Sequence, residues 1–452
     1  MVERYEVIVA GAGVAGASAA YFISRKGFKV LLVDVKPYAR AGDKPCGDAI
    51  GKHHFDELGM EYPGCEELEG LVKAVDVYSP SEGTRYRVLG EGFEVDRVRF
   101  TQRLIRGAVD RGAEYLDGAQ VSRPIVRGGS VVGAVLWRRG RGFWEVYSDV
   151  VIDATGVCRA VVSKLPKGWP ISEALNPRDT NIAYREVRVL REPIDEPEVL
   201  RIYISKKVAP GGYWWLFPYS LREGYVNVGL GVQGGVGNPN PKTLLHKYVV
   251  SRPELRGSTV VEAGGAAIPT RRPANTLVWN GVAVVGDAAF AVNPLHGGGK
   301  GSAMLSSYCV SEAVAEALGE RGATASELWY ANTCYIRRYG AKQAVLDLFR
   351  LFLQGLSDDD LEFGMSRKII REDDLNKISL RGDLELSVVD KAMRLLSGIR
   401  RPSLLLRLRA VANYMSRVKK LYARYPSEPE GLKEWLLELK GLYNEYFSRV
   451  LT

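Results

Sequence analysis

The chain has 452 residues, of which 46% are hydrophobic and 25% are charged, and its formal net charge at neutral pH is +9. This length allows two or three domains with apolar cores, and no uncharged apolar run is long enough to suggest a membrane-spanning helix. The positive charge favours an anionic partner, such as an acidic membrane or a phosphorylated ligand. Because no zinc-ligand spacing or nucleic-acid motif accompanies the charge, we expect neither a metal ion nor a nucleic acid as partner.

The amino-terminal segment has the pattern of a dinucleotide-binding unit. Residues 5–10 are predicted to form a strand, residues 17–26 a helix, and residues 29–33 a second strand. The turn between the first strand and the helix has the G-x-G-x-x-G spacing, which lets the backbone approach a pyrophosphate, and an acid after the second strand can bind ribose hydroxyls. The cofactor-binding residues predicted here are Gly11, Gly13, Ala15, Gly16 and Asp34.

A later segment, residues 150–156, reads as an apolar strand that ends in Ala-Thr-Gly, which makes Gly156 a further cofactor-binding candidate. Between residues 166 and 274 the chain is rich in β-branched and aromatic residues, separated by Pro and Gly turns. Strands are predicted there at residues 180–190, 198–205, 213–218 and 225–232. Such a sheet, laid over a cofactor, would form a substrate chamber.

The third of these strands is unusually aromatic, with the sequence Tyr-Trp-Trp-Leu-Phe-Pro over residues 213–218. Alternation along a strand sends Tyr213, Trp215 and Phe217 to one face, and Trp214 and Leu216 to the other. The three aromatic side chains on one face could line a dry pocket for a long apolar substrate. Ordinary core packing explains them equally well from this motif alone.

A glycine-rich turn follows the apolar run at residues 282–285 and leads into a helix predicted from about residue 302. A carboxylate at the carboxyl end of the preceding strand can accept hydrogen bonds from a ribityl chain. The N-terminus of the following helix can face the electronegative edge of a reduced flavin. The cofactor-binding residues predicted in this turn are Gly286, Asp287, Gly298, Gly299 and Lys300.

From residue 302 onward the sequence is predicted to be mostly helical. Residues 400–424 contain eight basic and no acidic side chains, with apolar residues at helical spacing. This pattern is typical of a helix that rests on anionic lipid, and also of a helix packed on its own domain with a solvated basic face, which we favour. Residues 432–447 carry a second apolar stripe, which indicates core packing or a partner-facing surface.

Together, the cofactor segments resemble those of two-dinucleotide-domain flavoproteins of the aromatic-hydroxylase type, which implies FAD as the cofactor. In that resemblance Arg97, which follows Asp96 at the start of a helix, faces the ribityl or phosphate region of the flavin. The pattern P-x-x-Y-x-W-x-F-P at residues 210–218 is that of the archaeal-type geranylgeranyl reductase family. Members of that family also carry a Cys-Gly pair beside the flavin, matched here by Cys46 and Gly47.

The resemblance implies an α/β fold in which a Rossmann-like FAD-binding domain carries an inserted antiparallel β-sheet domain and a helical C-terminal region. The expected boundaries are 1–70, 95–165 and 275–310 for the FAD-binding domain, 71–94 and 166–274 for the substrate-binding domain, and 311–452 for the helices. The implied activity is the reduction of isolated C=C bonds in geranylgeranyl chains, carried as the diphosphate or on a glycerophospholipid. NAD(P)H or reduced ferredoxin would supply the electrons.

Reduction of an isolated alkene needs a proton as well as a hydride, inside a chamber that excludes water. The candidates for the proton donor are Cys46, Tyr213 and His296. Basic side chains that could hold a phosphate or diphosphate head group are Lys206, Lys207, Arg271 and Arg272. Two alternatives remain, an FAD-dependent monooxygenase or halogenase and a non-catalytic lipid-binding flavoprotein.

Five cysteines without a C-x-x-C pair favour a reducing cytoplasmic location, with peripheral contact at the inner face of the cell membrane as a further expectation. Cys46 and Cys309 lie in or just after the two flavin-facing motifs. One hypothesis is that they form a redox-sensitive pair, and the other is that they are two unrelated buried thiols.

Overall fold

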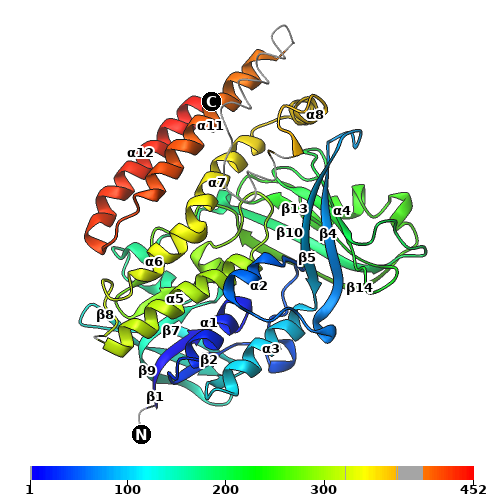
Figure 1. Cartoon of the computed structure of the whole chain (residues 1–452). Helices are drawn as coiled ribbons and strands as arrows, with labels where there is room; N and C mark the ends of the chain where they lie inside the picture. Colours follow the sequence, from blue (N-terminus) through cyan, green and yellow to red (C-terminus); the bar gives the residue numbers. More distant parts are fainter. Residues whose placement is uncertain (1–2, 321, 373, 375–400, 452) are drawn as a thin grey trace.

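The computed structural model describes residues 3–320, 322–372, 374 and 401–451. Two β-sheets lie side by side, and helices from the second half of the chain cover them (Figure 1). The amino-terminal strands and the last two helices are therefore at opposite faces of the molecule.

The first sheet has the strand order β15-β16-β9-β1-β2-β6, and β7 and β8 extend from β9 as an antiparallel meander. Its strands are β1 (Glu3–Ala10), β2 (Val30–Val33), β6 (Glu114–Leu116), β7 (Ala119–Arg127), β8 (Ser130–Arg138), β9 (Gly142–Asp153), β15 (Val278–Trp279) and β16 (Val282–Val284). The strands β16, β9, β1, β2 and β6 are mutually parallel. Their apolar runs are buried, as expected for parallel strands covered on both faces.

Three helices pack together on this sheet: α1 (Val14–Ser24), α3 (Arg97–Val109) and α5 (Lys300–Glu320). Asp96 caps α3 by accepting a hydrogen bond from the backbone N–H of Arg99 at 3.0 Å. The short helix α2 (His53–Leu58) packs against α5. The predicted strand-turn-helix-strand unit at the amino terminus is thus confirmed as β1, α1 and β2.

The second sheet has the order β14-β10-β13-β12-β11-β4-β5-β3. Its strands are β3 (Ala49–Gly51), β4 (Leu68–Tyr78), β5 (Arg85–Val95), β10 (Thr180–Val189), β11 (Val199–Tyr203), β12 (Tyr213–Pro218), β13 (Tyr225–Gln233) and β14 (Thr259–Pro269). All neighbours are antiparallel except β11 and β4, which run parallel. The four predicted strands between residues 180 and 232 are confirmed, and α4 (Pro241–Tyr248) packs on β10 and β13.

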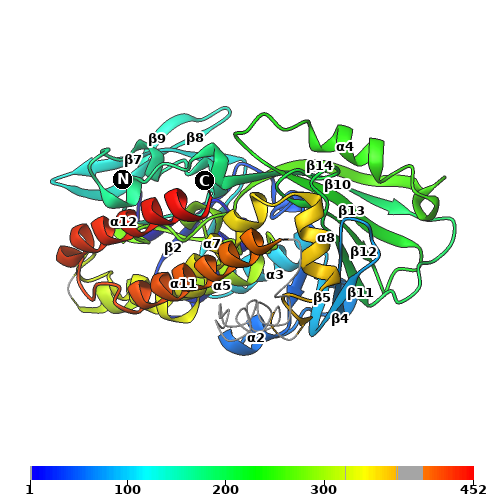
Figure 2. The same ribbon diagram turned by 90° about the horizontal axis from the view of Figure 1, so that it is seen from above.

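The remaining helices are α6 (Tyr330–Tyr335), α7 (Ala341–Gln354), α8 (Asp358–Ser366), α11 (Pro402–Ala423) and α12 (Leu432–Val450). Both views show α11 and α12 side by side above α7 (Figures 1 and 2). The apolar stripe of α11 is buried, and so is most of that of α12. Arg417 of α11 pairs with Glu445 of α12 at 2.9 Å. Arg424, which directly follows α11, pairs with Glu438 of α12 at 2.8 Å.

This arrangement agrees with the interpretation of residues 402–423 as a helix packed on its own domain. Arg400, which belongs to the predicted basic segment, lies outside the described residues. Among the helices that the structure describes, none has an apolar stretch of the length and hydropathy needed to cross a bilayer.

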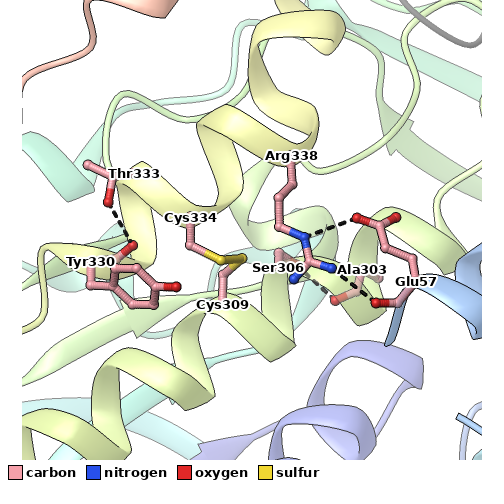
Figure 3. The surroundings of a disulfide bond; sticks show 8 residues. All are labelled: Glu57, Ala303, Ser306, Cys309, Tyr330, Thr333, Cys334 and Arg338. Carbon is pink, nitrogen blue, oxygen red and sulfur yellow. Dashed lines mark hydrogen bonds and ion pairs between the residues drawn. A yellow bond between two sulfur atoms is a disulfide. The ribbon is translucent and has the colours of Figure 1, made fainter. Parts of the chain in front are cut away.

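The hypothesis of a Cys46–Cys309 pair is wrong, because Cys309 forms a disulfide with Cys334 (Figure 3). The bond joins α5 to α6, which pack on each other. Cys46 is a free thiol near Lys300, at the start of α5. Cys309 follows Lys300 by nine residues, which corresponds to roughly 14 Å along a helix.

Candidate active site between the two sheets

The cofactor-binding candidates from four separate segments meet at one edge of the first sheet. Gly11, Asp34, Gly156 and Gly286 each follow one of the neighbouring parallel strands β1, β2, β9 and β16. Because the strands are parallel, their carboxyl ends lie together, and this is where open α/β sheets bind ligands. The order of strands explains why residues far apart in the chain form one site.

The glycines of the first turn have distinct structural roles. Gly11 has φ +96°, and a Cβ there would lie 2.6 Å from the carbonyl oxygen of Ala154. A Cβ on Gly16 would lie 1.8 Å from the carbonyl oxygen of Gly11, so this glycine permits close packing of helix on turn. A Cβ on Gly13 would meet no atom within 4 Å, so this residue presents its backbone to open space.

Polar groups at this edge have the chemistry that a flavin dinucleotide needs. The carboxylate of Asp34 accepts hydrogen bonds from the backbone N–H groups of Ala12 at 2.5 Å and Lys36 at 2.7 Å. Arg97, at the first position of α3, has a buried Nε atom without a hydrogen-bond partner in the protein. A buried guanidinium N–H calls for an anionic or carbonyl acceptor, which a phosphate or flavin oxygen would provide.

The second flavin-facing turn holds Asp287 in an ion pair with Lys44, whose Nζ is 2.6 Å from Asp287 Oδ2. Gly286 has φ +61°, and a Cβ there would meet the Cβ of Ala15 at 2.6 Å, so the two cofactor turns touch. Gly299 lies close to the same carboxylate, because a Cβ there would be 3.6 Å from Asp287 Oδ1. Together, the open backbone, the unpartnered Nε of Arg97 and the two acids fit FAD.

Cys46 and Gly47 lie between this edge and the second sheet. Lys300, the first residue of α5, has its Nζ 3.8 Å from Cys46 Sγ and 3.0 Å from Asp48 Oδ1. Asn227 of β13 donates a hydrogen bond to the carbonyl oxygen of Cys46 at 2.8 Å. The cysteine is therefore held by the second sheet, with a cation from α5 beside its thiol.

The face of β12 that carries Tyr213, Trp215 and Phe217, here called the aromatic wall, lies on the other side of the Cys46 loop from the cofactor edge. Trp215 and Phe217 belong to one apolar cluster, against which Tyr213 packs, whereas Trp214 and Leu216 belong to another, so the predicted alternation is confirmed. A Cβ on Gly47 would lie 2.9 Å from the Phe217 ring, which shows that the cysteine loop lies directly on this wall. Trp215 donates its indole N–H to Asn227 Oδ1 at 3.1 Å.

Tyr213 and His296 meet beside the same wall, since the Tyr213 hydroxyl donates to the backbone carbonyl of His296 at 2.6 Å. Desolvation raises the pKa of Tyr213 and lowers the pKa of His296 to about 4, although the imidazole keeps accessible surface. Its Nδ1 accepts a hydrogen bond from the backbone N–H of Gly298 at 3.1 Å. At neutral pH the imidazole is therefore neutral and serves the turn.

The four basic candidates for a head group separate into two pairs. Arg271 and Arg272 both bind Glu173, at 2.6 and 3.2 Å, and Arg271 is 5% exposed, so an internal carboxylate already pairs with both guanidinium groups. Lys206 and Lys207 are exposed beyond the end of β11. Their backbone N–H groups bind Asp358, the first residue of α8.

Several side chains at the site were missed by sequence reasoning. Asp48, Glu94, Arg185 and Asn227 are each at most 5% exposed and converge from β5, β10, β13 and the loop before β3. His54 packs across Gly301, where a Cβ would lie 2.1 Å from its ring. Only the position of Asp48 beside the Cys-Gly pair was a signal in the sequence.

A parallel sheet with a dinucleotide fingerprint at its carboxyl edge, joined to an aromatic-faced and mostly antiparallel sheet, defines a two-sheet flavoprotein of the aromatic-hydroxylase type. Solved structures of other proteins share this fold. A geranylgeranyl bacteriochlorophyll reductase-like protein from Thermoplasma acidophilum is 22% identical with a TM-score of 0.78, covering 91% of this chain and 100% of that one. A myxobacterial FAD-dependent chondrochloren halogenase is 17% identical with a TM-score of 0.63, covering 89% and 99%.

The sequence comparisons identify the family. A digeranylgeranylglycerophospholipid reductase of Sulfolobus acidocaldarius is 50% identical over 445 residues, which cover 98% of both chains. One from Methanothrix thermoacetophila is 32% identical and covers 85% of this chain and 96% of its own. Residues 179–268 match the geranylgeranyl reductase catalytic domain, and residues 6–72 match glucose inhibited division protein A. The chain belongs to the digeranylgeranylglycerophospholipid reductase family, which confirms the predicted resemblance to archaeal-type geranylgeranyl reductases.

Proposed function

We propose that this protein is an FAD-dependent reductase that saturates isolated C=C bonds of geranylgeranyl chains, with a geranylgeranylated glycerophospholipid as substrate. The observation that carries the proposal is the position of Cys46. Its loop lies between the cofactor edge and the aromatic wall, with Lys300 at 3.8 Å from the sulfur and Gly47 against Phe217. The names of the family relatives support the phospholipid as the preferred form of the substrate.

Reduced FAD, when bound, supplies a hydride to one carbon of the alkene. The other carbon must receive a proton, because an isolated alkene is not electrophilic enough to accept hydride alone. We assign this proton to Cys46. The Tyr213 hydroxyl is already donated to the His296 carbonyl, and the His296 imidazole is neutral at neutral pH because desolvation lowers its pKa to about 4.

The aromatic wall protects the developing positive charge on the alkene. Trp215 and Phe217 exclude water, and their ring faces attract a cationic carbon. Lys300 beside Cys46 is positioned to return a proton to the sulfur after each transfer. The exposed Lys206 and Lys207 would hold the phosphate of the lipid head group outside the apolar chamber.

The test is an anaerobic incubation of the dithionite-reduced protein with digeranylgeranylglycerophospholipid, followed by mass spectrometry of the lipid. We expect a mass increase of one hydrogen molecule for each saturated bond, and Cys46→Ala should retain FAD but lose the reduction. Geranylgeranyl diphosphate in a parallel reaction shows which head group is preferred. A product that requires oxygen would instead favour a monooxygenase or halogenase, and no reoxidation by any polyprenyl lipid would favour a non-catalytic flavoprotein.

The donor that reduces the FAD and the contact with membrane belong to the same proposal. NAD(P)H and reduced ferredoxin are the donors to compare, by anaerobic bleaching of the flavin absorbance. Because the substrate is a membrane lipid, we propose a peripheral contact at the inner face of the membrane, from a cytoplasmic protein. Co-sedimentation with anionic vesicles should retain the protein at low salt, whereas failure to bind vesicles that carry the substrate lipid would contradict the contact.

A further inference from the structure

A carboxyl group that the proposed reduction does not use is buried in the second sheet, on β5. Glu94 on β5 is 0% exposed, and neither of its carboxyl oxygens has a hydrogen-bond partner. The register places Glu94 opposite Ala49 of β3 and opposite Gly70 of β4. Its carboxyl group lies across Gly70, because a Cβ there would be 2.6 Å from Glu94 Oε2.

The residue beside this carboxyl group is Asp48, which is 5% exposed. The backbone N–H of Val95 donates to the Asp48 carbonyl at 3.1 Å, so the two acids stand on adjoining segments. Lys300 is 3.0 Å from Asp48 Oδ1, and the same Nζ is 3.8 Å from Cys46 Sγ. Lys300 therefore links Asp48 to the sulfur, and the Glu94 carboxyl group lies close enough to Asp48 to feel its charge.

The charges around Glu94 decide its protonation state. Burial raises the pKa of Glu94 well above its usual value, and the Asp48 and Glu69 carboxylates raise it further, whereas Lys300 opposes them. Tyr219 also faces this region, and Arg185 binds Asp48 at 3.8 Å and Glu262 at 2.6 Å. The positive charges available are Lys300 and Arg185, and Arg185 is shared with Glu262. They cannot neutralise both Asp48 and Glu94 in a dry site, so one of these two acids must stay protonated.

We propose that Glu94 is a neutral carboxylic acid that stores the proton delivered through Asp48 and Lys300 to Cys46 in each catalytic cycle. This inference rests on the proposed reductase function. When the Cys46 thiol gives its proton to the alkene, the Lys300 ammonium protonates the thiolate. The Lys300 amine then takes a proton from Asp48, which has received it from the Glu94 O–H, and the Glu94 carboxylate regains a proton from water after product leaves.

Glu94 is a positioning residue in this scheme, since it acts through Asp48 and Lys300 and does not touch the lipid. The first test is infrared spectroscopy of the full chain without substrate. We expect the C=O stretch of a protonated carboxyl group at neutral pH, lost in Glu94→Gln and kept in Glu91→Gln. Glu91 is the matched control because it lies on the same strand and pairs with Lys52 at the surface.

The second test uses Asp48→Asn, which removes the like charge beside Glu94 and keeps the side-chain size. The infrared band should then disappear at a lower pH than in the wild type, because Glu94 ionises more easily without the neighbouring carboxylate. An unchanged pH for the loss of the band would show that the two carboxyl groups do not interact, which would contradict the route through Asp48. The FAD content and melting temperature of each variant verify that it is folded.

The third test is the pH profile of kcat in the anaerobic lipid reduction. Glu94→Gln should lower kcat by roughly tenfold to a hundredfold, leave KM unchanged, and remove the fall of kcat with rising pH that the wild type shows as Glu94 ionises. Glu94→Asp keeps a carboxyl group, so its kcat should lie between that of Glu94→Gln and that of the wild type.

Absence of the band in the wild type, or an unchanged kcat and pH profile in Glu94→Gln, would overturn the proposal. If the wild type shows the band but does not reduce the lipid, the proposed function and the proton route fail together, and the neutral acid at position 94 stands alone.

Discussion

The absence of a side chain at position 229 leaves the space in which the Trp215 indole lies. A Cβ on Gly229 would be 2.1 Å from the indole ring, which cannot be accommodated without moving it. The indole N–H binds Asn227, and Asn227 binds the Cys46 carbonyl. One methyl group at this position would therefore disturb the aromatic wall and the cysteine loop together.

We predict that Gly229→Ala lowers the free energy of unfolding by about 1–3 kcal/mol through overpacking. It should also lower kcat for lipid reduction by roughly tenfold to a hundredfold, because the reacting groups are displaced. Denaturant titration and anaerobic kinetics measure the two effects. Gly90→Ala on β5 is the matched control, since a Cβ there meets no atom within 4 Å. Equal kinetics for both variants would refute the role of Trp215 in holding the site.

Arg97 gives a second prediction about a single side chain. Its buried Nε lacks a protein partner, so the guanidinium is free to bind an anionic part of FAD. We predict that Arg97→Gln weakens FAD binding by about tenfold to a hundredfold, the equivalent of one lost charge-assisted hydrogen bond. Fluorescence titration of the apoprotein with FAD measures this change. Arg99→Gln is the control, because Arg99 is exposed and pairs with Glu66 at 3.2 Å; if it has the same effect, the assignment is wrong.

At the scale of elements, the disulfide joins α6 to α5, the helix whose first residue, Lys300, lies at the site. The two cysteines are separated by 25 positions in the chain. We predict that reduction, or the double substitution of Cys309 and Cys334 by alanine, lowers the free energy of unfolding by about 3 kcal/mol. Chemical denaturation with and without reductant measures it. The double variant should show no further loss on reduction, and a loss of the same size there would mean that another thiol is responsible.

Elements with local signals were predictable from the sequence. Strands β10 to β13 were placed within a residue or two, because alternating β-branched and aromatic residues are bounded by Gly and Pro turns. The strand β14 was not predicted, since it contains two adjacent glycines and several alanines and is held by pairing with β10. The parallel pairing of β11 with β4 also has no local signal, because it depends on how two distant segments meet.

The residues of the site also divide into those with a local sequence signal and those without one. The turn glycines, Asp34, Asp287 and the aromatic strand could be proposed from the sequence because their expected roles depend on short motifs. Glu94 and Asn227 could not, since an isolated acid or amide in a strand carries no sign that its neighbours in space are Asp48 and Cys46. The disulfide was missed for a related reason, because the packing of α5 on α6 decides which cysteines meet.

At the scale of the whole molecule, two histidines with lowered pKa values are expected to make the protein sensitive to acid, although the His296 side chain keeps accessible surface. Desolvation lowers the pKa of His54 to about 3 and that of His296 to about 4, from an unfolded value of 6.5. Because the folded state binds fewer protons, these groups favour folding above the unfolded pKa. Their contribution is lost as pH falls from 6.5 towards about 4 for His296 and towards about 3 for His54. We predict that the apoprotein is less stable at about pH 5 than at about pH 7.

Denaturant titration at both pH values tests this prediction. His54→Phe keeps an aromatic ring over Gly301 and removes one titrating group, so its stability should fall less between the two pH values than that of the wild type. An equal loss in both proteins would show that His54 does not contribute to the acid sensitivity.

The parallel contact between β4 and β11 has a consequence for biosynthesis. The hairpin of β4 and β5 is complete at Val95, but its partner strand begins at Val199, after β6 to β9 of the first sheet have been made. A ribosome therefore exposes the hairpin with one open edge while the intervening segment is still being translated, and closure of such a long loop slows folding. The second sheet can be completed only after most strands of the first sheet have been made, so the order of synthesis favours formation of the first sheet before the second.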